Sequence, residues 1–381
     1  MDFSLTEEQL MIRDAAREFA KNELLPGVIE RDEKQEFPKE QVKKMAELGF
    51  LGMMVSPEYG GGGMDTVSYV LAMEEISKID ASCSVIMSVN NSLVCWGIEK
   101  YGTEDQKQKY LTKLATGEAL GAFCLSEPEA GSDATSQKTT AIEKDDHYLL
   151  NGVKNWITNG ETADYHLVIA QTHPEKKHRG INVFIVEKGW EGFEIGAKQD
   201  KLGIRGSDTH TLFFKDVKVP KENRIGEDGF GFKFAMKTLS GGRIGIASQA
   251  LGIASGAFEM ARDYSKVRKA FGTEISNHQA IAFKLAKMYT EIEAARHLVM
   301  KAAVDKDNEN SEVDLSGAMA KYYASKVAME ATVEAVQIHG GNGYVKEYHV
   351  ERLMRDAKIT QIYEGTSEIQ KIVISRAILK D

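Results

Sequence analysis

The hydrophobic periodicity of the chain changes twice, and these changes constrain the fold more than any other feature. From about residue 6 to 114, apolar residues recur at helical spacing. From about 121 to 226, short β-branched and aromatic runs such as YHLVIAQT and INVFIVEK alternate with turn residues, as in strands. Helical spacing returns at Gly229. We therefore expect a mainly α protein with an inserted all-β domain, divided into residues 1–118, 119–228 and 229–381.

The C-terminal part is expected to form a helical bundle. Between Ser276 and Ala303, apolar residues step by four and three, as at a bundle seam; they are Ile281, Leu285, Met288, Ile292, Ala295 and Val299. Capping-box patterns predict helix starts within SNHQ, from Ser276, and at Ser367, with Thr366 just outside the last helix. The polar stretch DKDNENSEVD is predicted to be a loop between two helices.

Composition excludes several functional classes. The chain has 381 residues and a net charge of -9, which argues against a nucleic-acid surface. Cys83, Cys95 and Cys124 have no CxxC spacing, so they predict buried, reduced thiols rather than disulfides or a zinc site. The N-terminus lacks a leader pattern and no long uninterrupted apolar run suggests a membrane span. We expect a cytoplasmic protein, although a mitochondrial matrix protein shown without its transit peptide would look the same.

Common catalytic motifs are missing from the sequence. No GxGxxG opens a helix after a strand, no HExxH pair suggests a metal site, and no GxSxG elbow suggests a hydrolase. The glycine-rich stretch PEYGGGGMD, Pro57 to Asp65, lacks the Lys-Ser/Thr of a phosphate-binding P-loop, so a flexible loop is favoured. Difficult chemistry would then require an organic cofactor, and no metal is expected.

Glu364, within the stretch IYEGTSEI, has two interpretations. On local grounds a solvated loop carboxylate is favoured, because charged residues are mostly exposed. Alternatively, Gly365 allows a tight turn and Tyr363 provides an apolar wall that raises the pKa of the carboxylate, so that Glu364 acts as a general base. The rest of the chain has to decide between the two.

Several stretches together resemble the acyl-CoA dehydrogenase family over nearly the whole chain. They are FCLSEPEAGSDA (123–134), WITNG (156–160), KLGIRGSDT (201–209), GRIGIASQALGIA (242–254), RKAFG (268–272), QIHGGNGY (337–344) and RDAKITQIYEGTSEI (355–369). The resemblance implies an FAD enzyme that removes hydrogens from the α and β carbons of an acyl-CoA and passes electrons to an electron-transferring flavoprotein. It also implies a helical domain, a β-barrel-like domain and a four-helix bundle, assembled as a homotetramer formed from two dimers.

The family resemblance reverses the local odds for Glu364. In most members the glutamate of the IYEG motif is the base that takes the α-proton, with its backbone N–H and a ribityl hydroxyl of FAD bonding the thioester oxygen. Some relatives carry the base immediately before the arginine of the GR pair, and Gly242 stands at that position here. Glu364 is therefore expected to be the base.

The resemblance also implies FAD contacts. Arg268 and Phe271 are expected to meet the diphosphate and adenine end of FAD from a neighbouring subunit, although a solvated helix-end arginine is the plain alternative. The apolar members near the isoalloxazine could instead be β-domain core. The implied set is Phe123, Leu125, Ser126, Gly131, Ser132, Trp156, Ile157, Thr158, Arg268, Phe271, Gln279, Gln337, Gly340, Gly341 and Thr366.

The implied acyl-CoA contacts carry two departures from the family. Many relatives have an aspartate where Ser240 stands, so one hydrogen bond to CoA is in question. Glu129 replaces a usual glycine and would be strained at a positive φ. The implied substrate contacts are Ser132, Leu239, Ser240, Arg243, Tyr363 and Gly365.

Acyl length is the least constrained property. The sequence of the stretch GRIGIASQALGIA is most similar to that of the short-chain, butyryl-CoA members of the family. Trp96 or Ile98, on the predicted helix from Val85 to Glu99, could shorten the acyl pocket, or could be ordinary core. Two alternative functions stay open: an acyl-CoA oxidase-like enzyme that returns electrons to oxygen, and a non-catalytic CoA-binding helical scaffold.

Overall fold

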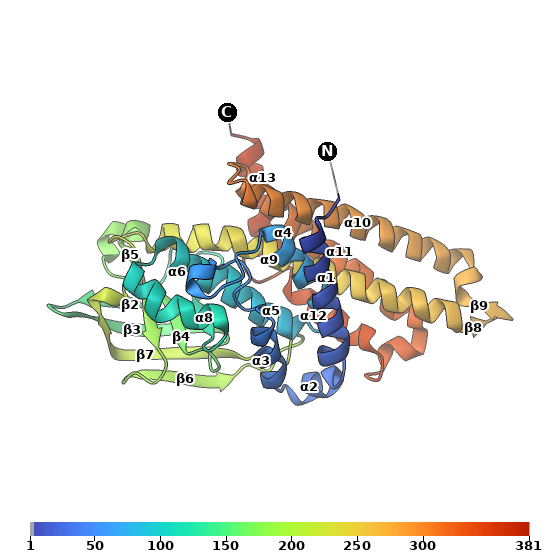
Figure 1. Cartoon of the computed structure of the whole chain (residues 1–381), viewed down its shortest axis with the longest axis horizontal. Helices are drawn as coiled ribbons and strands as arrows, with labels where there is room; N and C mark the ends of the chain where they lie inside the picture. Colours follow the sequence, from blue (N-terminus) through green and yellow to red (C-terminus); the bar gives the residue numbers. More distant parts are fainter. Residues whose placement is uncertain (1–3, 381) are drawn as a thin grey trace.

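The computed structural model describes residues 4–380, which form helical segments on both sides of a central β region (Figure 1). The first part is helical, and its longest helices are α1 and α4, which pack against each other. Asp65 caps α4 by accepting a hydrogen bond from the backbone N–H of Ser68. The elements are α1 (Glu7–Phe19), α2 (Val28–Lys34), α3 (Lys39–Glu47), α4 (Thr66–Ser77), α5 (Ala81–Ser88), the π-helical turn η3 (Val89–Cys95), α6 (Trp96–Tyr101), α7 (Glu104–Gln106) and α8 (Thr112–Thr116).

Seven strands form one mixed sheet in the middle of the chain. The pair β3 and β7 runs antiparallel over almost its full length, whereas β1 and β4 are parallel. Side chains between the strands form a second apolar core, separate from the main helical core. The strands are β1 (Gly121–Cys124), β2 (Thr140–Glu143), β3 (His147–Thr158), β4 (Tyr165–Gln171), β5 (Ile181–Glu187), β6 (Phe193–Lys198) and β7 (Thr209–Pro220).

Long helices form the C-terminal part, with α11 packed against α9, α10, α12 and α13. Figure 1 shows that α9 extends from the large sheet, at one end of the molecule, to the small hairpin of β8 and β9 at the other end. Its 37 residues correspond to about 55 Å of helix. The elements are α9 (Gly231–Val267), β8 (Lys269–Ala270), β9 (Thr273–Glu274), α10 (Gln279–Asp307), α11 (Val313–His339), α12 (His349–Ile359) and α13 (Ser367–Ile378).

The predicted fold class is confirmed, with corrections at two helix starts. The last helix begins at Ser367 as expected, but its N-cap is Thr366, whose hydroxyl accepts from the backbone N–H of Ile369. The expected capping box at Ser276 is wrong. Residues Ile275–Asn277 form a short 3-10 turn, and α10 begins at Gln279 without a side-chain cap. The turn keeps the chain extended through His278, so the helix cannot start earlier.

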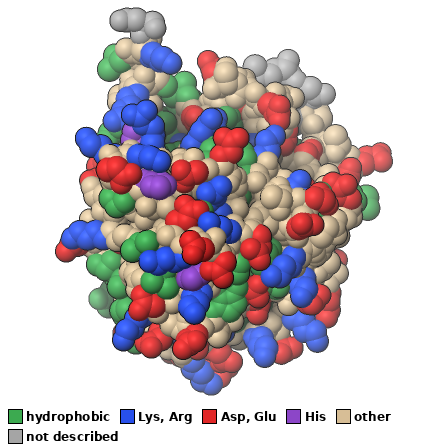
Figure 2. All heavy atoms as spheres, turned by 90° about the vertical axis from the view of Figure 1, so that its left-hand side faces the viewer, with side chains coloured by type: hydrophobic (Ala, Val, Ile, Leu, Met, Phe, Trp, Pro, Cys, Tyr) green, Lys and Arg blue, Asp and Glu red, His purple; other side chains and the backbone are tan. Residues whose placement is uncertain are grey.

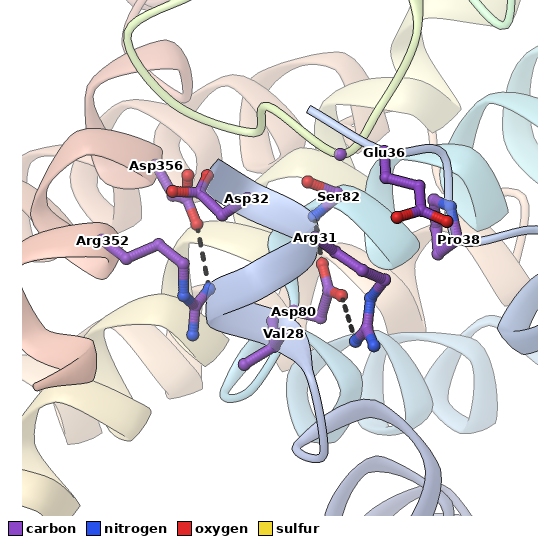
Figure 3. Close-up of a pocket in the computed structure, with 10 residues that line it drawn as sticks. Val28, Arg31, Asp32, Glu36, Pro38, Asp80, Ser82, Arg352 and Asp356 are labelled. Carbon is purple, nitrogen blue, oxygen red and sulfur yellow. Dashed lines mark hydrogen bonds and ion pairs between the residues drawn. The ribbon is translucent and has the colours of Figure 1, made fainter. Parts of the chain in front are cut away.

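A buried ionic cluster joins the three regions of the chain, as Figure 3 shows. Arg352 and Asp356, on α12, form a buried ion pair at 3.2 Å. The Asp356 carboxylate also accepts the backbone N–H of Ile204, at 2.5 Å, from the loop between β6 and β7. On the N-terminal side, Arg31 of α2 pairs with Asp80 at 3.3 Å. The enclosed cavity is about 10 Å³, which is room for about one water.

The cysteines and the face of the molecule at the β-sheet end do not suggest another class of function. The thiols of Cys83, Cys95 and Cys124 are free and buried, as predicted. The helical segment Ala81–Tyr101 is long and apolar enough to cross a membrane, but 94% of its 18-residue window is buried inside the protein, as in a core helix. On the face at the β-sheet end, basic and acidic side chains are intermixed (Figure 2), so that face presents no broad basic surface.

Candidate active site

Glu364 lies on a strained turn between α12 and α13. Its φ is +51° and that of Gly365 is +91°, both in the left-handed region. Glycine adopts this conformation freely, but a glutamate there costs about 1–3 kcal/mol. Hydrogen bonds hold the turn: Lys321 Nζ donates to the Gly365 carbonyl at 2.5 Å, and Gln370 Nε2 donates to the same oxygen at 2.8 Å. Strain of this kind is typical of functional sites.

Glu364 as a whole is only partly buried, but the Oε2 atom of its carboxyl group is buried. Oε2 is shielded from solvent and makes no hydrogen bond within residues 4–380. It faces α9 at Gly242 and lies beside Leu93 of η3, which approaches the same glycine. An unsatisfied carboxylate oxygen is costly unless a ligand or a proton completes it. The solvated-loop interpretation does not fit this environment.

Burial raises the pKa of Glu364 to about 7, while the positive charges of Lys321 and Arg243 oppose that rise. A carboxylate with a pKa near neutrality is suited to accept a proton from carbon, because its basicity is greater than that of an ordinary glutamate and it is still partly ionised. The electrostatics therefore favour the general-base interpretation of Glu364.

Tyr363 and Gln249 form a neutral wall beside this carboxylate. The Tyr363 hydroxyl donates to Gln249 Oε1, and Gln249 Nε2 donates to the Ala81 carbonyl at 2.9 Å. Burial raises the pKa of Tyr363 far above its usual value, so its hydroxyl stays protonated. The hydroxyl of Tyr363 is thus committed to Gln249 rather than to Glu364, and the apolar wall stays a prediction.

Ser240 and Arg243 share a carboxylate partner from another helix. The Ser240 hydroxyl donates to Oδ1 of Asp314, on α11, and Arg243 Nη1 lies 4.0 Å from the same atom. Arg243 is 8% exposed and its Nε has no hydrogen-bond partner within the described chain. Asp314 thus brings an acidic group to the position where Ser240 departs from the family. Leu239 packs beside them on the main core.

The implied isoalloxazine residues lie at one end of β1 and β3. Buried Lys154 ties the two segments together, donating to the Leu125 carbonyl at 3.0 Å and to Glu127 at 2.7 Å. The backbone N–H of Asn155 donates to the Ser126 carbonyl at 2.9 Å. Phe123 and Leu125 pack on the same helical core as Tyr363. Thr158 ends β3 and is partly buried.

Trp156 and Ile157 are neighbours in the sequence, but their side chains differ sharply in exposure to solvent. Trp156 has a φ of +61° and a side chain that is 61% exposed, an unusual state for a large aromatic group without a ligand. Ile157 is 2% exposed and packs in the β core, so only its backbone is available to a cofactor. Gly131 and Ser132 are exposed on the loop after β1.

The condition for strain at Glu129 is not met. Its φ is not positive; it lies in a turn closed by hydrogen bonds between Glu127 and Ala130, where any residue is tolerated. Its exposed side chain pairs with Lys138. The departure from glycine therefore carries no backbone cost.

Apart from Thr366, which caps α13 next to the Glu364 turn, the remaining implied FAD residues lie at the other end of the molecule, near the β8–β9 hairpin (Figure 1). Arg268 ends α9, and Phe271 has a φ of +53° with a 98% exposed ring. Gly340 has a φ of +59°, and a methyl group at Gly340 or Gly341 would meet only open space. Gln279 and Gln337 are also exposed there. One chain does not bring this group to its own Trp156.

Sequence reasoning missed several residues around Glu364. Leu93, rather than Trp96 or Ile98, is the residue of its helical segment that approaches Gly242; Trp96 packs against Tyr101 and Ile98 is fully buried. Lys321 was also missed, although a lysine on the apolar face that carries Ala318 and Ala324 is a detectable signal. Tyr69, Gln249 and Asp314 gave no comparable signal, and Gln370 was recognised only as the residue that completes the capping-box pattern of Ser367.

Comparisons with known proteins match these features over the whole chain. Family models described as the N-terminal, middle and C-terminal domains of acyl-CoA dehydrogenase match residues 6–118, 122–217 and 229–379. A relative from Clostridium acetobutylicum, named a short-chain specific acyl-CoA dehydrogenase, is 52% identical over 100% of both chains.

Solved structures agree with the same assignment. The butyryl-CoA dehydrogenase of Megasphaera elsdenii has a TM-score of 0.98 at 50% identity, covering 100% of both chains. A chain described with the electron transferring flavoprotein of Acidaminococcus fermentans has a TM-score of 0.99 at 52% identity, again over 100% of both chains. This chain belongs to the acyl-CoA dehydrogenase family and is an oxidoreductase of that family.

Proposed function

We propose that this enzyme converts short-chain acyl-CoA thioesters to trans-2-enoyl-CoA with FAD as cofactor and Glu364 as the base, and that an electron-transferring flavoprotein takes the electrons. The observation that carries the proposal is the Glu364 carboxyl group, which has a buried, unpartnered Oε2 and a pKa near 7. A spectator carboxylate would be solvated or paired. The names of the 52% identical relative and of the butyryl-CoA dehydrogenase structure support the substrate class.

The residues present fit FAD. Trp156 exposes a large ring, and the hydrogen bond from Asn155 to Ser126 joins its segment to the one that carries Leu125, which offers an apolar and aromatic surface for a flat ring system. The open space around Gly340 and Gly341 allows backbone N–H groups to approach a diphosphate, and Arg268 supplies a bidentate cation. When bound, FAD supplies a hydride acceptor for the β carbon of the substrate.

The residues of the chain prepare the α-proton for removal. We propose that Glu364 accepts that proton at its carboxylate and that its backbone N–H bonds the thioester oxygen as negative charge develops there. Tyr363, the residue before Glu364, keeps its hydroxyl protonated because burial raises its pKa, so it adds no second negative charge beside the carboxylate. Arg243 and Ser132 are the proposed contacts for the CoA part, and Leu93, at the Gly242 side of the carboxylate, bounds the acyl chain.

A homo-oligomer, proposed to be a tetramer, completes the FAD site. The β8–β9 end of the chain exposes large apolar side chains: Phe271 at 98%, Tyr344 at 86% and Phe283 at 65%. Exposed apolar groups gathered in this way are typical of interfaces. Because Arg268 and Phe271 lie far along α9 from the large sheet, we propose that they serve the FAD of another subunit.

Anaerobic visible spectra test the proposal. The purified wild type is expected to be yellow and to bleach when butyryl-CoA is added, whereas Glu364→Gln is expected to hold FAD but stay oxidised. A Glu364→Gln enzyme that bleaches at the wild-type rate would remove the base assignment. A wild type that never binds FAD after supplementation would remove the flavoenzyme proposal, and oxygen consumption as fast as bleaching would indicate an oxidase.

A further inference from the structure

Lys321 is a buried lysine beside the proposed base. It lies on α11 and is fully buried, although lysine is almost never buried without a partner. Its Nζ donates to the Gly365 carbonyl at 2.5 Å, so it contacts the residue immediately after Glu364. Within residues 4–380, Lys321 is the one lysine that hydrogen-bonds to the Glu364–Gly365 turn.

The ionisable groups around this lysine come from several elements. Glu364 stands on the turn, Glu368 on α13 and Arg243 on α9, and each affects the charge of Lys321. The two carboxylates favour the charged ammonium and Arg243 disfavours it. Asp314 of α11 faces Arg243 at 4.0 Å, so part of the charge of Arg243 is already balanced. The neutral hydroxyls of Tyr363 and Tyr69 complete the surroundings of the carboxylate.

We propose that Lys321 is a positioning residue for Glu364: its hydrogen bond holds the left-handed Glu364–Gly365 turn, and its positive charge keeps the carboxylate ionisable in a buried site. This inference rests on the proposed function of Glu364. In this role Lys321 supports the base but does not itself exchange a proton with the substrate.

The charge and the hydrogen bond are separable because a neutral donor serves the same carbonyl. Gln370 Nε2 donates to the backbone carbonyl of Gly365 at 2.8 Å and to the backbone carbonyl of Glu364 at 3.3 Å. If the turn needed only donors, a second amide would suffice. A lysine there costs desolvation, since burial lowers the pKa of Lys321 to about 8. At neutral pH it is still mostly charged, so its effect on Glu364 persists at the pH where the base works.

The direction of the effect follows from charge. A nearby cation favours the ionised carboxylate, so removing the cation raises the pKa of Glu364. Lys321→Met is expected to raise the pH midpoint of flavin reduction by about one unit or more. At a pH below both midpoints, the anaerobic reduction rate with butyryl-CoA should then fall about tenfold or more.

Matched variants separate this effect from simple loss of structure. Gln370→Leu removes an uncharged donor to the same carbonyl, and its pH midpoint is expected to stay at the wild-type value even if the rate falls. Lys321→Gln keeps a donor without charge and covers the case in which the methionine variant does not fold; its midpoint should rise too. Lys43→Met, on the exposed face of α3, controls for loss of a lysine charge and should change neither quantity.

A readout without turnover checks the same shift. Infrared spectra taken across the neutral pH range should show the band of protonated Glu364, assigned by its loss in Glu364→Gln, and the midpoint of that band should move upward in Lys321→Met and Lys321→Gln. Unshifted midpoints in both lysine variants would overturn the inference, as would equal shifts in Gln370→Leu. A Glu364→Gln enzyme that still bleaches would instead overturn the proposed function, which keeps the two failures distinct.

Discussion

A methyl group at Gly242 would lie 2.2 Å from Oε2 of Glu364, well inside any tolerated contact. Leu93 blocks the other side of the same position, with its Cδ2 atom 2.7 Å away. The space that a side chain at residue 242 would need is therefore taken by the carboxylate from the α12–α13 turn. Gly242 corresponds to the position from which some relatives supply their base, so in this chain the two positions exclude each other for steric reasons.

Gly242→Ala is expected to lower the rate of flavin reduction about a hundredfold, because the new methyl group displaces the Glu364 carboxylate by the order of an ångström. FAD content should be retained, since Gly242 is not among the proposed FAD contacts. Anaerobic stopped-flow absorbance with butyryl-CoA measures the rate.

The matched control for that variant is the neighbouring glycine. A methyl group at Gly241 would first meet Nζ of Lys306, at 3.2 Å, which is the flexible end of a long side chain. Gly241→Ala should therefore reduce its flavin nearly as fast as the wild type. Similar rates for both alanine variants would mean that the Gly242 contact does not position the base.

Glu364→Gln is expected to stabilise the folded protein in alkaline solution. Burial raises the pKa of Glu364 from 4.5 to about 7, so the stability associated with its protonated form is present below the unfolded value and lost as the pH rises through the folded one. At about pH 8 the variant should gain roughly 1–3 kcal/mol over the wild type, and at about pH 5 much less. Thermal unfolding at both pH values measures this difference.

The result has a clear contrary outcome. If Glu364→Gln changes the free energy of unfolding equally at both pH values, the carboxylate titrates alike in the folded and unfolded chains. The site would then not perturb the pKa of Glu364, and a raised pKa could no longer support its assignment as the base, even if the variant were inactive.

Arg352→Met is expected to destabilise the protein by about 3–5 kcal/mol, because it leaves the buried Asp356 carboxylate without its cation. Burial already raises the pKa of Asp356 to about 6. Adding Asp356→Asn should recover much of the loss, since the amide oxygen can still accept the N–H of Ile204. Denaturant unfolding of the single and double variants measures both effects. A double variant no more stable than Arg352→Met alone would contradict this explanation, because removing the unpaired carboxylate would then relieve no cost.

The order of the structural regions was predictable because the hydrophobic period of the β region differs from that of the helical regions on either side of it. The strands and the long helices follow that period, and Ile292 and Val299 are buried where the predicted seam places them. Helix starts were less predictable. Ser276 matches a capping pattern, but residues Ile275–Asn277 form a short 3-10 turn instead. The start of α10 therefore depends on the path of the chain between the β8–β9 hairpin and the helix.

The contacts around Glu364 could not be derived from the sequence for a different reason. They come from α9, α11 and the η3 segment, and which residues of these elements meet is decided by tertiary packing. Gly242 was identified as a base position in relatives, but nothing in the sequence showed that Glu364 fills its side-chain space. Likewise, the partnership of Ser240 with Asp314 links residues 74 positions apart.

Arg268→Ala is expected to lose most of its FAD, and mixing it with Glu364→Gln should restore activity if Arg268 serves another subunit. Phe271, three residues later, is 98% exposed at the end of α9 opposite the large sheet, so a single chain does not close its own site. In a mixed dimer, the subunit with intact Glu364 receives Arg268 from its Glu364→Gln partner. Random reassortment of equal amounts would then yield about a quarter of the wild-type sites.

The complementation experiment requires the two variants to be dissociated, mixed and reassembled with FAD before butyryl-CoA oxidation is measured. Each variant alone, treated in the same way, is the control and should be nearly inactive. Because neither variant contains a complete set of these residues, recovered activity can come only from a site built by two chains. Full FAD binding by Arg268→Ala, or no recovery from mixtures shown to contain both chains in one oligomer, would place Arg268 outside the cofactor site.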